Sequence, residues 1–168
     1  MTTETKMVPE EEARKAIQDM SRRVALLHMC YARALVDALG EERGKELIKK
    51  AIWDYGTIVG KRSRERVREL GLEPTLANMG RGNDLSPLGF DHRRVVVDGE
   101  ARSQSHGCVL AEIWDEYGEN ELGGLYCLVD PSKMQAYDAH YTMIHCKKMP
   151  DGDEYCEIAI RPVKGSND

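Results

Sequence analysis

The stretch from His106 to Ile160 reads HGCVLAEIW at 106–114, ELGGLYCLVD at 121–130 and MIHCKKMPDGDEYCEIAI at 143–160. Four of the five cysteines fall inside it, with three of the five histidines and several acidic residues. Thiols, imidazoles and carboxylates are the side chains that serve as nucleophiles, acid–base catalysts and metal ligands. We therefore expect the functional site in this stretch and a supporting scaffold before it.

The same stretch predicts much of a sheet. Residues 108–114 alternate as a strand does, and strands are also expected at 141–148 and 154–163, joined by a turn at 150–152. A short helix broken at Pro131 is expected over residues 119–137. In the strand register of 108–114, one face carries Cys108, Leu110, Glu112 and Trp114, and also His106 if the strand extends so far.

Towards the N-terminus the sequence predicts a hairpin and two long helices. Residues 93–97 and 101–106 have strand propensity, and Asp98-Gly99 between them is typical of a hairpin turn. Apolar residues recur at helical spacing over 9–39 and 41–70. In the second helix Gly56 and Gly60 lie four residues apart, which lets another backbone approach closely.

These elements predict an α+β fold, in which N-terminal helices pack on a C-terminal antiparallel sheet with an inserted helix. The length of 168 residues suits one domain with a real core. We expect a single domain over residues 9–163, a disordered leader at 1–8 and a polar tail at 164–168.

Composition narrows the classes of function. A net charge of −5 argues against nonspecific binding to nucleic acid or to an anionic membrane. No apolar run approaches the roughly 20 residues that span a bilayer, and the N-terminus lacks the apolar core of a signal peptide. A cytoplasmic protein is therefore expected, and its cysteines should be free thiols or metal ligands. No CxxC pair, P-loop, GxGxxG, HExxH or nucleophile elbow is present.

Cys127 and Asp130 form one candidate pair. If their segment is helical, the two side chains lie three residues apart on one face. A thiol acts as a nucleophile in its thiolate form, which a cationic neighbour, a base or a helix N-terminus favours. Gly123 and Gly124 nearby permit either close substrate approach or tight packing. The alternative for Cys127 is a buried small apolar residue, which is common for free cysteines.

A second group of candidates comes from the predicted sheet. Cys108 with Glu112 and His106 could bind a metal or form an acid–base set, whereas the alternative is an exposed acid and an ordinary surface histidine. A strand meander can bring Cys156 close to Cys108. Further candidates are His145 as a metal ligand, and Tyr126 and Trp114 as substrate contacts, although these aromatic residues are more often core. His92 is expected to face solvent.

Several of these features occur together in one known family. They are Leu39-Gly40; Tyr55-Gly56 with Gly60; Cys108 in HGCVLAEIW; Leu122-Gly123 before Cys127 and Asp130; and Gly152-Asp153 before Cys156. The pattern resembles the L-2-amino-thiazoline-4-carboxylic acid hydrolase family over about residues 25–162. The C-terminal part also looks like the cysteine-bearing vinyl-reductase-type domain, which implies a related ligand-binding α+β fold.

The resemblance implies ring-opening hydrolysis of a C–N bond in a small cyclic amidine- or amide-like substrate. Our leading hypothesis makes Cys127 the nucleophile and has Asp130 or Glu112 move protons, while Cys108 and Cys156 shape the pocket or share the chemistry. It requires no cofactor. A homodimer through the long helices is the expected assembly.

Two other functions stay open at this point. In the first, zinc or another soft-ligand metal activates water. Its ligands would come from Cys108, Cys127, Cys156, His106 and His145. In the second, the domain is no enzyme but senses or carries a small molecule, haem or a metal.

Overall fold

The computed structural model describes residues 7–83 and 85–163. Most of the expected leader, residues 1–8, and the whole expected tail, residues 164–168, lie outside these residues. The fold is α+β, with two long helices before a four-stranded antiparallel sheet and further helices inserted between its strands. The predicted fold class is therefore confirmed.

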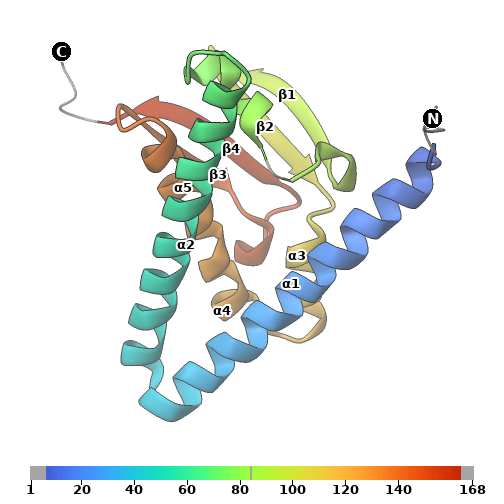
Figure 1. The fold of residues 1–168 in the computed structure, drawn as a ribbon. Helices are drawn as coiled ribbons and strands as arrows, with labels where there is room; N and C mark the ends of the chain where they lie inside the picture. Colours follow the sequence, from blue (N-terminus) through green and yellow to red (C-terminus); the bar gives the residue numbers. More distant parts are fainter. Residues whose placement is uncertain (1–6, 84, 164–168) are drawn as a thin grey trace, which may run out of the picture.

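Two long helices form a V that holds the sheet at its open end (Figure 1). Helix α1 spans Glu10–Leu39 and α2 spans Glu41–Glu69, joined at Gly40 with a φ of 79°. Glutamates fill the first turn of each helix, where the positive end of the helix dipole favours acids. Both helices were predicted to within about one residue at each end, since their apolar spacing is long and regular.

The sheet has the strand order β1-β2-β4-β3. Its strands are β1 (Asp91–Val97), β2 (Glu100–His106), β3 (Tyr141–Lys147) and β4 (Cys156–Pro162). The predicted turn at Asp98-Gly99 joins β1 to β2, and both residues have positive φ, 51° and 80°. Strand β4 comes last in the sequence but lies in the middle of the sheet, between β2 and β3.

The segment between β2 and β3 is helical. It contains α3 (Val109–Glu116), α4 (Asn120–Gly124), the 3-10 turn η3 (Leu125–Leu128) and α5 (Val129–Tyr137). Pro131 lies in the first turn of α5 and does not break it, because proline is tolerated there. The remaining 3-10 turns are η1 (Leu76–Gly82), η2 (Pro87–Gly89) and η4 (Met149–Asp151).

The predicted strand over 108–114 is wrong, because these residues begin α3. Gly107 turns the chain at a φ of 62° directly after β2, and Cys108 precedes the first helical residue. Val109 and Ile113 lie four residues apart and are both buried, as on one side of a helix. A segment this short fits the strand period of two residues and the helical period of 3.6 residues equally well. The shared strand face of Cys108, Leu110, Glu112 and Trp114 therefore does not exist.

The glycines of α2 set how closely α5 packs. A Cβ at Gly56 would overlap the side chain of Ser132, and one at Gly60 would overlap the Lys133 carbonyl oxygen. This confirms that the pair allows a close backbone approach. The core continues through Met134 and Tyr137 of α5, both 0% exposed. None of the described helices combines the length and the apolar character that a membrane crossing requires.

Candidate functional site

A row of polar side chains crosses three strands on one face of the sheet, which we call the site face. His92 of β1 pairs with Ser105 of β2, and Ser105 pairs with Cys156 of β4. Directly opposed residues of antiparallel strands point to the same face. Ser105 Oγ and His92 Nδ1 are 2.7 Å apart. The row runs from an exposed histidine on the edge strand to a half-buried cysteine inside the sheet.

A second histidine reaches the site face from β3. His145 pairs with Ile158, two residues beyond Cys156, so His145 is a diagonal neighbour of Cys156. Its Nε2 lies 3.1 Å from Oδ2 of Asp130 in the first turn of α5. Asp130 also accepts a hydrogen bond from Lys133 Nζ at 3.3 Å. Asp130 thereby orients the imidazole of His145 beside Cys156.

The carboxyl of Asp130 is held in its charged form. Burial opposes its ionisation, but the hydrogen bond from His145 and the charge of Lys133 outweigh burial and lower its pKa. A carboxylate that accepts a hydrogen bond from one ring nitrogen fixes the histidine tautomer. The other ring nitrogen of His145 is then available to exchange a proton on the site face.

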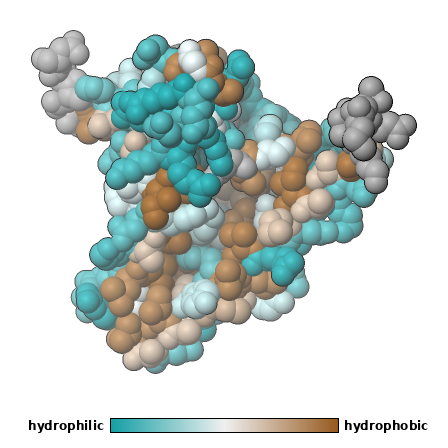
Figure 2. All heavy atoms as spheres, viewed as in Figure 1, coloured by the Kyte–Doolittle hydropathy of each residue, from teal (hydrophilic) through white to brown (hydrophobic). Residues whose placement is uncertain are grey.

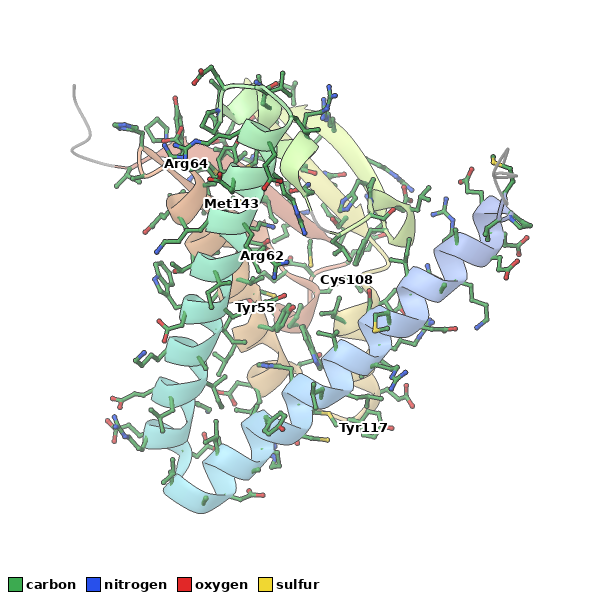
Figure 3. The ribbon with its side chains drawn as sticks, viewed as in Figure 1. Tyr55, Arg62, Arg64, Cys108, Tyr117 and Met143 are labelled. Carbon is green, nitrogen blue, oxygen red and sulfur yellow. The ribbon has the colours of Figure 1, made fainter. Side chains whose placement is uncertain are left out.

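Two cysteines from distant parts of the chain meet at this face. The Cys108 and Cys156 thiols lie near each other, and their interaction shifts the pKa of both. Met149 joins them, because its backbone N–H donates to Cys156 Sγ at 3.4 Å and its Sδ accepts from the Cys108 backbone N–H at 3.4 Å. Figure 3 shows Cys108 in the middle of the molecule, between the sheet and α1. Cys108 and Cys156 therefore do approach each other, but Cys108 precedes α3 and does not lie on a strand of a meander, as the sequence had suggested.

The surroundings separate the protonation of these two thiols. The Cys108 thiol, the Met149 N–H and the charge of His145 lower the pKa of Cys156, although burial and Asp130 oppose this. The pKa of Cys108 is raised, first because its proton is shared with Cys156 and then because it is buried. A negative charge on the pair is therefore stabilised on Cys156, with Cys108 as its hydrogen-bond donor.

Cys127 lies in η3, and its surroundings differ. Burial and the negative charge of Asp130 raise its pKa to about 12. The predicted nearness of Cys127 and Asp130 is confirmed, but the carboxylate disfavours the thiolate. Cys127 and Cys108 both pack on the apolar cluster around Trp114. Cys127 and Cys156 thus lie beside the Asp130 carboxylate and Cys108 lies near both of them, and each of the three cysteines is half-buried.

A comparison with known families shows which family the chain belongs to. The profile of the L-2-amino-thiazoline-4-carboxylic acid hydrolase family matches residues 18–160, which is most of the chain. The chain belongs to this family. No curated protein and no solved structure matches it. Membership supports a hydrolase-like function for the chain.

Two other predicted site residues of this hydrolase-family member make their side-chain contacts outside the group of three cysteines. His106 is on the opposite face of β2, against the Tyr155 ring at 4.8 Å, because it neighbours Ser105 on an alternating strand. Glu112, on α3 rather than on a strand, is half exposed and lies 4.0 Å from Arg22 of α1.

The predicted substrate contacts take structural positions. Trp114 is 1% exposed, and its Nε1–H donates to the Ala25 carbonyl oxygen. A Cβ at Gly123 would overlap Trp114, and one at Gly124 would come 3.1 Å from Pro150. The geometry of Gly123 and Gly124 therefore fits tight packing, the alternative to close substrate approach. Tyr126 is half-buried and lines a groove described below.

Sequence reasoning missed His92 and Ser105. A lone histidine in FDHRR and a serine in ARSQSH match no motif. The only available signal was the register of the Asp98-Gly99 hairpin, since a two-residue turn there places His92 opposite Ser105. The pairing of Ser105 with Cys156 was out of reach, because it depends on where the last strand enters the sheet.

The proposed metal ligands of this hydrolase-family member do not come together as a metal-binding group in the part of the chain that the structure describes. Within residues 7–83 and 85–163, no group of three or more His, Cys, Asp or Glu side chains is arranged to hold a metal ion. Of the proposed ligands, His106 and His145 lie on opposite faces of the sheet. Cys146, which follows His145, contacts the carbonyl oxygen of Ile144.

An apolar groove of about 520 Å³ lies between α1 and α2. Figure 2 shows apolar side chains of both helices along the inner side of the V, below the sheet. The imidazole of His28 enters it, with Nε2 3.1 Å from the Leu122 carbonyl oxygen, and burial lowers the pKa of His28. Its lining is Val24, Leu27, His28, Tyr31, Ala32, Leu35, Ile48, Ala51, Ile52, Tyr55 and Tyr126. None of the three cysteines lines this groove.

Proposed function

We propose that this chain hydrolyses a carbon–nitrogen bond in a small cyclic amidine- or amide-like substrate, with a cysteine as the nucleophile. Family membership supports the hydrolase class. The observation that carries the cysteine mechanism is the contact between the Cys156 and Cys108 thiols beside the His145–Asp130 pair. A thiol, an imidazole and an orienting carboxylate are the groups that nucleophilic hydrolysis requires.

We assign the attack to Cys156 in place of Cys127, the residue that the sequence favoured. The pKa of Cys156 is lowered by hydrogen-bond donors, whereas the pKa of Cys127 is raised to about 12 by burial and by Asp130. Only the thiolate attacks an amidine carbon efficiently. Cys127 then forms part of the wall of the site, and Cys108 donates a hydrogen bond to the attacking sulfur.

The reaction proceeds in two halves. The Cys156 sulfur bonds to the amidine carbon, the ring C–N bond breaks, and the leaving nitrogen takes a proton to become an amine. Water then bonds to the same carbon and the S–C bond breaks. One hydrogen of the water ends on the remaining nitrogen and the other on Cys156. His145, oriented by Asp130, accepts the proton of the attacking water and returns it to the sulfur.

The N-terminus of α3 supports the charged sulfur. This helix begins directly after Cys108, so the positive end of its dipole lies beside the Cys108–Cys156 pair. The backbone N–H of Gly123 is already engaged, because it donates to the Glu119 carbonyl oxygen at 2.8 Å. The first turn of α3 is therefore our choice for stabilising developing charge.

Two serine variants test the assignment. Cys156→Ser should lower the turnover of L-2-amino-thiazoline-4-carboxylic acid by at least about 10³-fold, because a serine hydroxyl is not ionised at neutral pH. Cys127→Ser should keep turnover within about tenfold, and Cys30→Ser, on the exposed surface of α1, serves as the matched control. Ring opening is followed by mass spectrometry. Full activity in Cys156→Ser with loss in Cys127→Ser would return the nucleophile to Cys127.

The groove between α1 and α2 favours a second function, the binding of an apolar small molecule without catalysis. Aromatic rings and His28 line it, as is typical of ligand pockets. Native mass spectrometry of the purified chain should then show a retained metabolite that Ala51→Trp, which fills the groove, releases. If native mass spectrometry gives the mass of the chain without a ligand both before and after the substitution, this function is excluded.

The expected homodimer stays a prediction. Exposed apolar side chains on the long helices, such as Leu27, Tyr31 and Ile58, support it. Sedimentation equilibrium should give the mass of two chains, and the mass of one chain over the accessible concentrations would contradict it.

A further inference from the structure

The site face holds two histidines, one on each side of Cys156, and the mechanism above uses only His145. The second, His92, is hydrogen-bonded to Ser105, the residue directly opposite Cys156. Directly opposed Cβ atoms lie roughly 4.5–5.5 Å apart. A carbon bonded to the Cys156 sulfur therefore lies within reach of the Ser105 hydroxyl.

His92 is suited to exchange a proton with this hydroxyl. Burial lowers the pKa of His92, although Asp91 and Asp130 act in the opposite direction, so the neutral imidazole is favoured. A neutral imidazole accepts a hydrogen bond on Nδ1 when its proton is on Nε2. Ser105 Oγ–H is then the donor over the 2.7 Å distance, and the Oγ lone pairs remain available towards Cys156.

We propose that Ser105 is a catalytic residue of the reaction assigned above and that His92 is its positioning residue, the two forming a relay that protonates the leaving nitrogen. The proposal rests on the proposed function. It is carried by the cross-strand row His92–Ser105–Cys156 and by the hydrogen bond within it.

The relay carries one proton to the leaving nitrogen. The Cys156 thiol ionises by releasing its proton to water, since Cys108 and the Met149 N–H stabilise the thiolate, and His92 Nδ1 takes up one proton from water. When the ring C–N bond breaks, Ser105 gives a proton to the departing nitrogen and is reprotonated by His92. The thioimidate on Cys156 and the free amine together contain every atom of the thiol and the amidine. His145 and Asp130 then move protons only in the hydrolysis of that intermediate, so each histidine transfers protons in one half of the reaction.

Two probes that differ in their leaving group separate this role from a structural one. L-2-amino-thiazoline-4-carboxylic acid expels a nitrogen that needs a proton, whereas p-nitrophenyl acetate expels a phenolate that needs none. General acid catalysis contributes about 10²–10⁴-fold. Ser105→Ala and His92→Gln should therefore lower kcat for ring opening by about 10²-fold or more. The same variants should acylate Cys156 with p-nitrophenyl acetate within about threefold of the unaltered protein, since the phenolate leaves unassisted.

Two further variants complete the design. Ser105→Thr keeps the hydroxyl on a strand that accommodates threonine and should restore most of the ring-opening rate. His140→Gln replaces an exposed histidine away from the site face and should change neither rate.

The outcomes separate a failure of the relay from a failure of the proposed function. Ring opening undiminished in Ser105→Ala and His92→Gln would overturn the relay alone. An equal loss with both probes would also overturn it, because the variants would then have displaced Cys156. Acylation of the unaltered protein without any ring opening would overturn the proposed function and the relay together.

Discussion

Cys156 and Cys127 lie on the same side of the sheet, but their neighbours favour opposite protonation states. Cys156 has donors in the Cys108 thiol and the Met149 N–H, whereas Cys127 has burial and the Asp130 carboxylate. The identity of a residue thus says little about its reactivity, since the shift in pKa comes from its partners. This is why the sequence could indicate which cysteines come together, but placed the nucleophile at Cys127, whose pKa is raised.

Thiol labelling tests that ranking at the level of single residues. With iodoacetamide at neutral pH, Cys156 should react about tenfold or more faster than Cys127, because a larger fraction of it is thiolate. The Cys156 rate should rise with pH through a midpoint below 9.0, the ordinary value for a thiol. His145→Gln removes the imidazole that favours the thiolate whenever it carries a proton, and should move this midpoint upward. Peptide mass spectrometry reads each site, in a Cys30→Ser background that removes the exposed thiol of α1.

The result that contradicts this assignment is specific. If Cys127 labels faster than Cys156, Cys156 is not the more ionised thiol. If His145→Gln leaves the midpoint in place, His145 does not act on the sulfur of Cys156. The Cys156→Ser protein identifies the peptide signal that belongs to the fast thiol.

At the level of elements, the spacing of apolar residues predicted the secondary structure correctly where the pattern was long. Helices α1 and α2 and the β1–β2 hairpin follow from apolar spacing and from Asp98-Gly99. Residues 108–114 did not, because seven residues can satisfy a period of two or of 3.6. The structure resolves the ambiguity through Gly107, whose positive φ ends β2 and turns the chain into α3.

The contact between α2 and α5 depends on the absence of a side chain. Gly60→Ala would place a methyl group against the Lys133 carbonyl oxygen and the Ala136 side chain. Because backbone must move to admit it, we expect a loss of about 1–3 kcal/mol in the free energy of unfolding. Urea denaturation followed by circular dichroism measures this. Gly80→Ala is the control, since a Cβ there meets open space, and equal midpoints for the two variants would refute the packing argument.

At the scale of the whole molecule, the sheet separates two polar networks. The site face carries Cys156 and the two histidines. The opposite face carries Glu157, 2% exposed, which accepts hydrogen bonds from Arg102 at 2.7 Å and Gln104 at 2.8 Å. The α+β class could be predicted from the order of helices and strands. Neither network could be predicted, because each requires β4 to lie between strands that are remote from each other in the sequence.

The network of the opposite face should make stability depend on acid pH. The hydrogen bond from Arg161, followed by that from Arg102, lowers the pKa of Glu100 from 4.5 to about 2. A carboxyl whose folded pKa is depressed stabilises the fold above its unfolded pKa and loses that contribution as the pH falls towards the folded value. The melting temperature should therefore fall between about pH 5 and pH 2, and Glu100→Gln should flatten part of that fall.

The matched control for this prediction is Glu46→Gln, which replaces an exposed acid on α2. Its melting temperature should follow the unaltered protein across the acid range. Parallel curves for Glu100→Gln and the unaltered protein would show that the Arg161 and Arg102 contacts do not stabilise the fold.

The central place of β4 has a consequence for biosynthesis. A ribosome makes the helices, both hairpin strands and β3 before it makes β4, so the nascent chain carries β2 and β3 with open edges and no partner between them. The catalytic sulfur that we assign arrives on that last strand. We therefore expect a chain interrupted after β3 to lack the proposed nucleophile and to be prone to aggregate.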